Sequence, residues 1–208
     1  MPQPSEESPG RILVTGGTGY LGRALMPQLV IRGYDVRALV RPESVRKLPP
    51  GVDAVVGNAL LTEDVAQVLT GCPTLVHLVR IPKPAPSKAR QFREIDLVSI
   101  QASVAAATRM VQRPHLVYLS VAQPASMMKA FIQVRAQGEA LIRRSGLDAT
   151  LLRPWYVLGP GHRWPYLLLP LYALMECFPA TRPSAQRLAL VTLPQMVAAL
   201  VNAVENPA

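Results

Sequence analysis

Short apolar runs alternate with amphipathic stretches along most of the chain, and this alternation predicts strands and helices in turn. Strands are expected at 11–15, 35–40, 54–57, 74–78, 115–120, 148–152 and 187–191. Helical spacing occurs between them, at 20–32, 62–69, 92–111, 126–145 and 194–204. Buried strands that alternate with helices are typical of βαβ units in a parallel sheet covered on both faces. The pattern therefore predicts an α/β fold with a doubly wound parallel sheet and a ligand crevice at the carboxyl ends of its strands.

A glycine-rich turn, TGGTGYLG at 15–22, joins the first predicted strand to the first predicted helix. This context is that of a dinucleotide-binding fingerprint and of a Rossmann fold. An early glycine permits the tight turn, Gly19 lets the backbone approach a pyrophosphate, and Gly22 lets the helix lie close to the strand. The helix N-terminus then offers free N–H groups to the phosphates. The residues expected to contact a dinucleotide here are Gly16, Thr18, Gly19, Tyr20, Leu21 and Gly22.

Composition is that of one globular domain, because the 208 residues are 50% apolar. The first ten residues are polar and proline-rich and are expected to be a disordered tail, which leaves 11–208 as the domain. The net charge of +9 admits nucleic acid or an anionic membrane as partner. Because the basic residues are scattered apart from a cluster between 80 and 93, a basic face that attracts an anionic nucleotide is the favoured interpretation, and nucleic acid is disfavoured.

Two cysteines, Cys72 and Cys177, show no ligand-type spacing, so a reducing, cytoplasmic location and the absence of a metal site are expected. The apolar segment 164–178 is too short and too rich in proline for a membrane span. It is open to three interpretations: the wall of a substrate pocket, a subunit or partner interface, or a peripheral membrane contact. We expect 159–190 to form a small C-terminal substrate cap. The proline-rich stretch 80–90 is expected to be a loop, either a basic flap over the crevice or a plain surface connection.

The glycine spacing, the stretch VVGNALLTEDVAQVLTGC, the strand TLVHLV and the block GLDATLLRPWYVLGPG follow one another as in the extended and atypical short-chain dehydrogenases/reductases. The chain resembles most the atypical group with NmrA-like regulators and the NAD(P)H-binding subunit of respiratory complex I. The resemblance covers about residues 11 to 161. It implies that the adenine lies beside Asn58 and Ala59, and that Leu78, Val79, Arg80 and Pro154 border the cofactor.

Cofactor preference depends on the end of the second strand, where NAD-binding members carry an acidic residue. Here Val40 occupies that place and Arg41 follows it. An arginine can form charge-assisted bonds with a 2′-phosphate. NADP(H) is therefore the expected cofactor, with NAD(H) as the alternative.

The catalytic signature of the resembled families, Tyr-x-x-x-Lys on a helix, is degenerate in this chain. Phe131 occupies the tyrosine position and Arg135 the lysine position, while Val121 falls where a serine is expected. Arg135 is expected to hold ribose hydroxyls, and Tyr156 is a weak candidate for the missing proton donor. Tyr118 is expected to point into the packing of the sheet.

Three functions follow from this pattern. The first is an NADPH-binding redox sensor or assembly partner with little or no catalysis. The second is an oxidoreductase that transfers hydride from NADPH to an apolar carbonyl, quinone or isoprenoid-like substrate. A minor third is a protein that acts at a membrane surface. Homo-oligomers are compatible with each.

Overall fold

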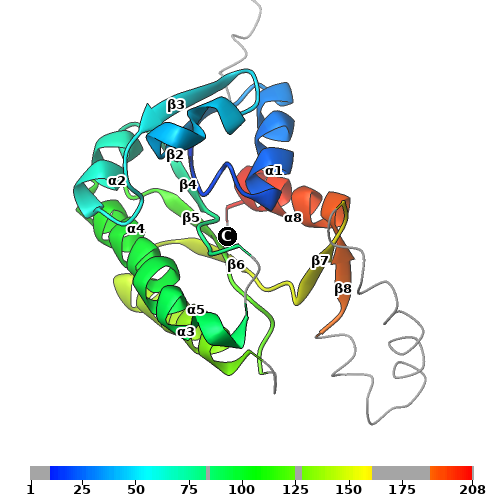
Figure 1. Ribbon diagram of the computed structural model, residues 1–208. Helices are drawn as coiled ribbons and strands as arrows, with labels where there is room; N and C mark the ends of the chain where they lie inside the picture. The colour runs from blue at the N-terminus through cyan, green and yellow to red at the C-terminus, as the bar shows by residue number, and fades with distance from the viewer. Residues whose placement is uncertain (1–9, 83–84, 125–127, 161–187, 208) are drawn as a thin grey trace, which may run out of the picture.

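Parallel strands form the central layer of the molecule, and helices cover both faces (Figure 1). The computed structural model describes residues 10–82, 85–124, 128–160 and 188–207. In this part of the chain the main sheet has six strands in the order β3-β2-β1-β4-β5-β6, all parallel. They are β1 (Arg11–Thr15), β2 (Asp35–Val40), β3 (Val52–Val56), β4 (Thr74–His77), β5 (His115–Leu119) and β6 (Ala149–Leu152). The order reverses between β1 and β4, which confirms the doubly wound sheet and places the crevice at their carboxyl ends.

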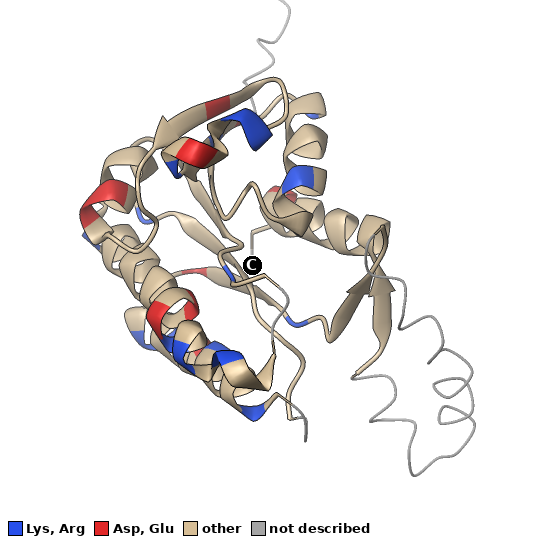
Figure 2. Cartoon of the chain, viewed as in Figure 1, with Lys and Arg blue, Asp and Glu red and all other residues tan. Residues whose placement is uncertain are grey.

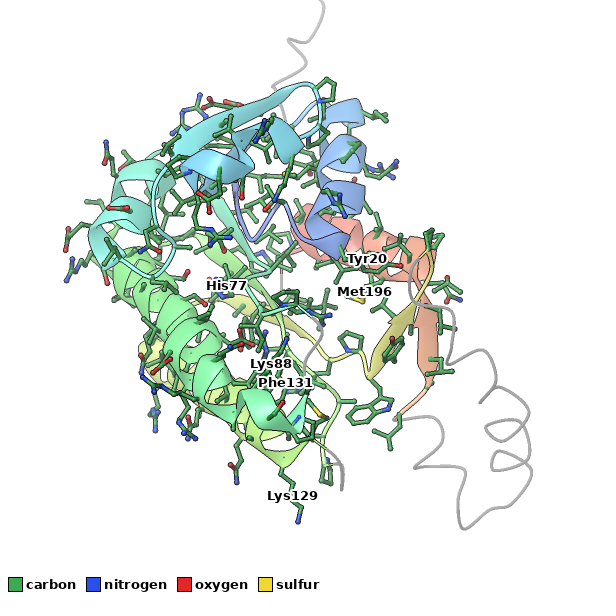
Figure 3. All side chains as sticks on the ribbon, viewed as in Figure 1. Tyr20, His77, Lys88, Lys129, Phe131 and Met196 are labelled. Carbon is green, nitrogen blue, oxygen red and sulfur yellow. The ribbon has the colours of Figure 1, made fainter. Side chains whose placement is uncertain are left out.

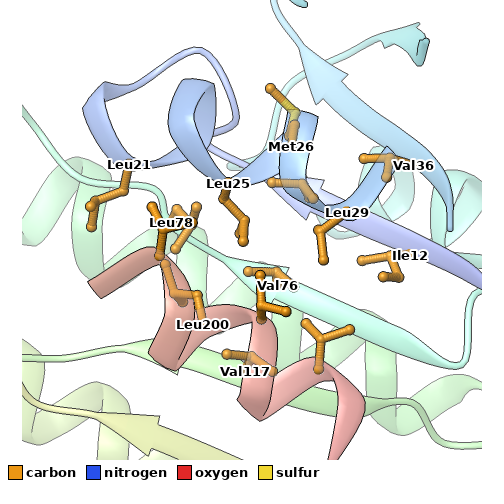
Figure 4. Packing of buried hydrophobic residues seen from close by; sticks show 14 of the residues in the cluster. Ile12, Leu21, Leu25, Met26, Leu29, Val36, Val76, Leu78, Val117 and Leu200 are labelled. Carbon is orange, nitrogen blue, oxygen red and sulfur yellow. The ribbon is translucent and has the colours of Figure 1, made fainter. Parts of the chain in front are cut away.

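Helices α1 (Tyr20–Ile31) and α8 (Leu193–Glu205) cover one face of the sheet. Leu25 and Leu29 of α1 are fully buried there with Leu200 of α8 and Val76 of β4 (Figure 4). Thr192 begins α8 with a capping box, since its side chain accepts from the Gln195 N–H and the Gln195 side chain bonds back to Thr192.

The other face is covered by α2 (Thr62–Leu69), α4 (Val98–Arg109) and α5 (Lys129–Ser145). A second cluster of buried residues lies under these helices and includes Leu75, Ile100 and Leu116. Glycines end two of the helices, because Gly33 after α1 and Gly146 after α5 both have positive φ.

Several elements differ from the sequence-based predictions. The predicted helix 92–111 begins with a π-helical turn, η3 (Phe92–Leu97), before α4. The predicted loop 80–90 is wrong in its second half, where a 3₁₀ turn, η2 (Pro86–Lys88), leads into α3 (Ala89–Gln91). The reason is that proline at a first helical position loses no hydrogen bond. A further 3₁₀ helix, η1 (Pro42–Lys47), follows β2 and was not predicted.

A separate two-stranded sheet contains β7 (Tyr156–Leu158) and β8 (Leu190–Thr192). The strand predicted at 187–191 is therefore present with shifted bounds, whereas β7 was not predicted. The N-terminal tail, most of the predicted cap and the apolar segment 164–178, with Cys177, lie outside the described residues. No helix in the described part is long and apolar enough to cross a bilayer.

Candidate dinucleotide site

The glycine loop between β1 and α1 lies directly against the segment that follows β4. The Gly19 N–H donates to the Gly16 carbonyl at 3.0 Å, which closes the turn. Gly16 has a φ of +75°, and a Cβ atom there would lie 2.6 Å from the carbonyl carbon of Leu78. Only glycine satisfies both the backbone conformation and the close approach. The loop and the end of β4 therefore form one continuous backbone surface at the switch point of the sheet.

The first turn of α1 has the features of an anion site. Gly19 is the N-cap residue, no side chain caps the helix, and no acidic residue lies in the first turn. Its first N–H groups have no partner within the helix, and the positive end of the helix dipole is not neutralised. A Cβ on Gly22 would meet the backbone of Gly17, which confirms that Gly22 brings the helix against the loop. These features fit a dinucleotide pyrophosphate, for which backbone donors and a close approach are required.

Arg41 and Asn58 lie on the β2 side of the loop. Arg41 follows β2, and its exposed guanidinium pairs with Glu43 at 3.1 Å. The Asn58 side-chain oxygen accepts from the Leu60 N–H at 3.0 Å, and the Asn58 N–H donates to Asp64. The amide NH₂ group of Asn58 is thus the part of this side chain left to contact a base. Tyr20 points away toward α8 and β7, where Gly159 leaves room for its ring (Figure 3).

Arg135 lies inside the protein, which is the largest departure from the expected site. Its guanidinium donates to Asp96 at 3.1 Å, to the Val79 carbonyl at 3.2 Å and to the Leu119 carbonyl at 3.2 Å. Asp96 comes from η3, and its other oxygen accepts from the Ile81 N–H at 2.9 Å. Arg135 is 1% exposed and Asp96 is 0% exposed. The Nε atom of Arg135 has no hydrogen-bond partner in the described part of the chain.

This pairing leaves Arg135 little freedom to act on a cofactor. Each bond to Asp96, Val79 or Leu119 would have to be exchanged before the guanidinium reached a ribose hydroxyl, so that role stays a prediction. Burial raises the pKa of Asp96, and the Arg135 charge and the Ile81 N–H partly offset the rise. The expectation for Tyr118 is confirmed, because its ring is fully buried with its hydroxyl 3.4 Å from Arg135.

Phe131 covers the buried guanidinium from the side of the crevice. Its ring centroid lies 5.2 Å from the Arg135 guanidinium carbon and 5.2 Å from the Phe92 ring, and the side chain is 7% exposed. The arrangement is a cation–π contact inside an apolar cluster. Phe131 has no proton to give, so the position that carries the acid in the resembled families serves packing here.

The end of β5 is held by a second buried charge on α5. Glu139 is 1% exposed and accepts from Ser120 at 2.6 Å and from two nitrogens of Arg153 at 2.8 and 2.7 Å. Arg143 also donates to it, at 2.6 Å. Burial favours the protonated acid, but these hydrogen bonds outweigh burial and lower the pKa of Glu139. Ser120 therefore faces α5 rather than the crevice, and sequence reasoning missed the Glu139 cluster.

His77 is a satisfied core residue, as its position in an apolar strand predicts. It is 0% exposed, and its Nδ1 lies 3.1 Å from the Thr15 hydroxyl and 3.0 Å from the Ser103 hydroxyl. Ser99 lies 3.3 Å from its Nε2. Burial, with a smaller contribution from the Arg135 charge, lowers the pKa of His77 to about 3. The imidazole is therefore neutral and links β1, β4 and α4 beneath the glycine loop.

Arg80 and Tyr156 come together on the β4–β6 side of the crevice. Arg80 is exposed, and the Tyr156 phenol is close enough to influence the pKa of Arg80. Pro154 ends β6, and its carbonyl accepts from the Ala122 N–H at 3.2 Å. A proton-donor role for Tyr156 and the cofactor contacts of Ala59 and Pro154 stay predictions. The open hollow of about 420 Å³ beside α5, lined by Gln123, Pro124, Lys129, Ile132 and Gln133, contains none of these residues.

Known proteins share this chain's sequence pattern. The pattern of a family described as NAD(P)H-binding matches residues 16–163. The chain is 28% identical over 171 residues to 4-hydroxy-2-methyl-3-oxo-4-farnesyl-3,4-dihydroquinoline-1-oxide ketoreductase of Stigmatella aurantiaca, across 72% of this chain and 51% of that protein. It is 26% identical over 200 residues to ceramide reductase of Caulobacter vibrioides, across 95% of this chain and 62% of that protein. The chain thus spans about half to three fifths of the length of these relatives.

Solved structures share the fold. The Bordetella bronchiseptica enzyme WbmH in complex with NAD⁺ superposes with a TM-score of 0.71 at 20% identity, over 95% of this chain and 73% of that one. The family pattern begins at Gly16, within the glycine loop, and extends past β7. It thus includes every strand of the main sheet after β1 and both sides of the crevice. The chain belongs to the NAD(P)H-binding family, in agreement with its resemblance to the atypical short-chain dehydrogenases/reductases.

Proposed function

We propose that this protein is an NADPH-dependent reductase that works without the helix-borne tyrosine of related enzymes. The observation that carries the proposal is the uncapped N-terminus of α1 behind a glycine loop that touches the end of β4. Bound NADPH would supply the hydride, solvent would supply the proton that completes reduction of a carbonyl, and the chain would position the two reactants in the crevice. Holding the two reactants in the right geometry accounts by itself for a large part of the rate of hydride transfer. The names of the relatives, a ketoreductase and a ceramide reductase, support reduction of a carbonyl or related group.

The preference for NADPH is carried by Arg41. Its guanidinium follows β2 and is exposed to solvent, and only Glu43 is paired with it in the described part of the chain. A 2′-phosphate would take the place of this surface ion pair, which is weak in water. The phosphate would gain a charge-assisted bond in return.

Calorimetric titration with NADPH and with NADH tests this proposal. We expect NADPH to bind more tightly, and Arg41→Ala to lose about tenfold in NADPH affinity, or ~1.4 kcal/mol, while NADH affinity changes little. Arg46→Ala is the matched control, because Arg46 is an exposed arginine of η1, the 3₁₀ helix that directly follows Arg41. Binding of neither nucleotide would contradict the proposal. Equal loss of both affinities in Arg41→Ala would contradict the role of Arg41 alone.

A non-catalytic NADPH sensor or assembly partner is the second candidate. It is favoured by Phe131, which cannot donate a proton, and by Arg135, whose guanidinium is occupied by Asp96. Oxidation of NADPH with a panel of quinones and ketones separates the two functions. Turnover with any acceptor supports the reductase, whereas binding without turnover across the panel supports the sensor.

A further inference from the structure

Arg80 is presented to the crevice by a backbone that a buried ion pair holds on both sides. The Val79 carbonyl accepts from Arg135, the Ile81 N–H donates to Asp96, and these two side chains bond to each other at 3.1 Å. Ile81 is buried in the cluster around Phe131, whereas Arg80 is exposed. The backbone is therefore fixed immediately before and after Arg80, and the Arg80 side chain is left on the solvent side.

The Arg80 guanidinium has no hydrogen bond or ion pair with any described residue. It still meets solvent, but the dense protein around it and repulsion by Arg135 lower its pKa, while Asp96 and Tyr156 act in the opposite direction. An arginine remains charged under such influence. Two positive charges, Arg80 and Arg135, thus face one carboxylate, and Arg135 and the Ile81 N–H already satisfy that carboxylate. Among the described residues, one positive charge is left uncompensated in the crevice.

The order of the strands separates this charge from the phosphates of a dinucleotide. The pyrophosphate would lie over β1 at the start of α1, and a 2′-phosphate would lie beside Arg41 at the end of β2. Arg80 follows β4, which lies on the other side of β1. It adjoins the part of the crevice that Phe131 and Tyr156 border, where the reacting end of the dinucleotide would meet its substrate.

We propose that Arg80 binds an anionic group, a carboxylate or a phosphate, on the substrate that is reduced in this crevice. The planar fork of a guanidinium matches either group with two parallel hydrogen bonds. The Arg135–Asp96 pair acts as a positioning device, because it fixes the two peptide groups that flank Arg80. This inference rests on the proposed function, since the substrate is defined by its place beside the dinucleotide.

The test uses three small probes on protein saturated with NADP⁺. Benzoate and phenyl phosphate carry the two anionic groups on the same ring, and benzyl alcohol is their neutral counterpart. We expect calorimetry to detect binding of at least one anion, and Arg80→Gln to weaken it at least about tenfold more than it weakens NADP⁺. Benzyl alcohol should bind equally to both proteins. Arg80→Lys keeps the charge and loses the planar fork of the guanidinium. Its affinity for the anion should therefore lie between those of the wild type and Arg80→Gln.

Arg93→Gln is the matched control, because Arg93 is an exposed arginine on the neighbouring η3 that forms no ion pair with the described residues. It should bind both anions like the wild type. Failure of the wild type to bind either anion, or equal binding by Arg80→Gln, would overturn the inference. A loss confined to NADP⁺ would also overturn it, by assigning Arg80 to the dinucleotide. Failure of NADP⁺ to bind the wild type at all is a different result, and it would count against the proposed function itself.

Discussion

The two halves of the crevice are built in opposite ways. The half formed by β1, β2 and α1 presents backbone groups, and the first turn of α1 carries no acidic side chain and no side-chain cap. The half formed by β4, β5 and α5 holds the buried ion pair of Arg135 with Asp96, and the buried Glu139, which pairs with the exposed Arg153. The first turn of α1 therefore presents backbone N–H groups that no side chain occupies. The buried charges of the second half hold the protein together, and Arg80 forms no ion pair with the described residues. We therefore expect mutations to separate dinucleotide binding from reduction.

Charge is spread thinly over the rest of the molecule (Figure 2). Basic and acidic side chains occupy several helices and turns rather than one continuous stripe. For the binding of an anion in the crevice, the local excess of positive charge at Arg80 therefore matters more than the net charge of +9.

The largest expected effect comes from breaking the charged half. Asp96→Ala leaves the buried Arg135 without its counter-charge, and we expect unfolding in urea to show a loss of about 3–5 kcal/mol. Replacing both partners, as Asp96→Leu with Arg135→Met, should recover most of this loss because no buried charge remains. Glu94→Ala is the control, since Glu94 forms an exposed ion pair and should leave the midpoint unchanged. An Asp96→Ala protein as stable as the wild type would contradict the description of this pair.

The second largest effect is expected from a substitution in the glycine loop. Gly22→Ala places a methyl group against the backbone of Gly17, so the loop must move. We expect it to cost about 1–3 kcal/mol of stability. NADPH affinity should fall at least about tenfold. Gly71→Ala is the comparison, because the positive φ of Gly71 strains an alanine there but no atom lies within 4 Å of the added methyl group. It should lose stability and keep its NADPH affinity; equal losses of affinity would argue against the loop as the binding element.

A smaller effect is expected from the buried His77, which makes the free energy of unfolding depend on pH. His77 has a folded pKa of about 3, below the 6.5 of an unfolded histidine. The unfolded state therefore binds the proton first, and stability falls as the pH drops below 6.5. Between pH 7.5 and pH 5.5 this group alone should cost about 1.4 kcal/mol. Urea unfolding of His77→Gln should lack this part of the pH dependence, whatever its stability at neutral pH. Identical pH profiles would mean that the pKa of His77 does not differ between the folded and the unfolded protein.

The smallest structural change sharpens the comparison most directly. Phe131→Tyr adds one hydroxyl to a ring that is already packed on Phe92 and Arg135. We expect NADPH affinity to stay within about threefold, or ~0.6 kcal/mol, because the glycine half is untouched. Reduction of a ketone should rise, but by less than the roughly 10²–10⁴-fold that a general acid contributes, since Arg135 does not assist the tyrosine. An unchanged rate would mean that residue 131 is not near the reacting carbonyl.

Much of the fold was predictable because its signals are local. The observed bounds of β1, β2 and α2 agree to the residue with those predicted from the apolar runs and the helical spacing. The glycine spacing indicated the loop and the start of α1 for the same reason. The 3₁₀ helix η1 and strand β7 were missed, because each is too short to show a period.

The charged half was not predictable in this way. Helical spacing places residues 131 and 135 on one face of α5, but it does not show whether that face meets the crevice or α4. A signal did exist, because Asp96 interrupts the apolar side of the predicted helix 92–111. A lone acid in such a place needs a buried cation, and Arg135 is that cation.

The small sheet of β7 and β8 has a consequence for how such proteins diversify. Leu158 is paired with Thr192, so the two ends of the stretch of chain between them lie side by side. Each doubling of the length of a stretch closed in this way costs only about 0.6 kcal/mol in chain entropy. Evolution can therefore exchange or lengthen this stretch while the nucleotide-binding core keeps its stability.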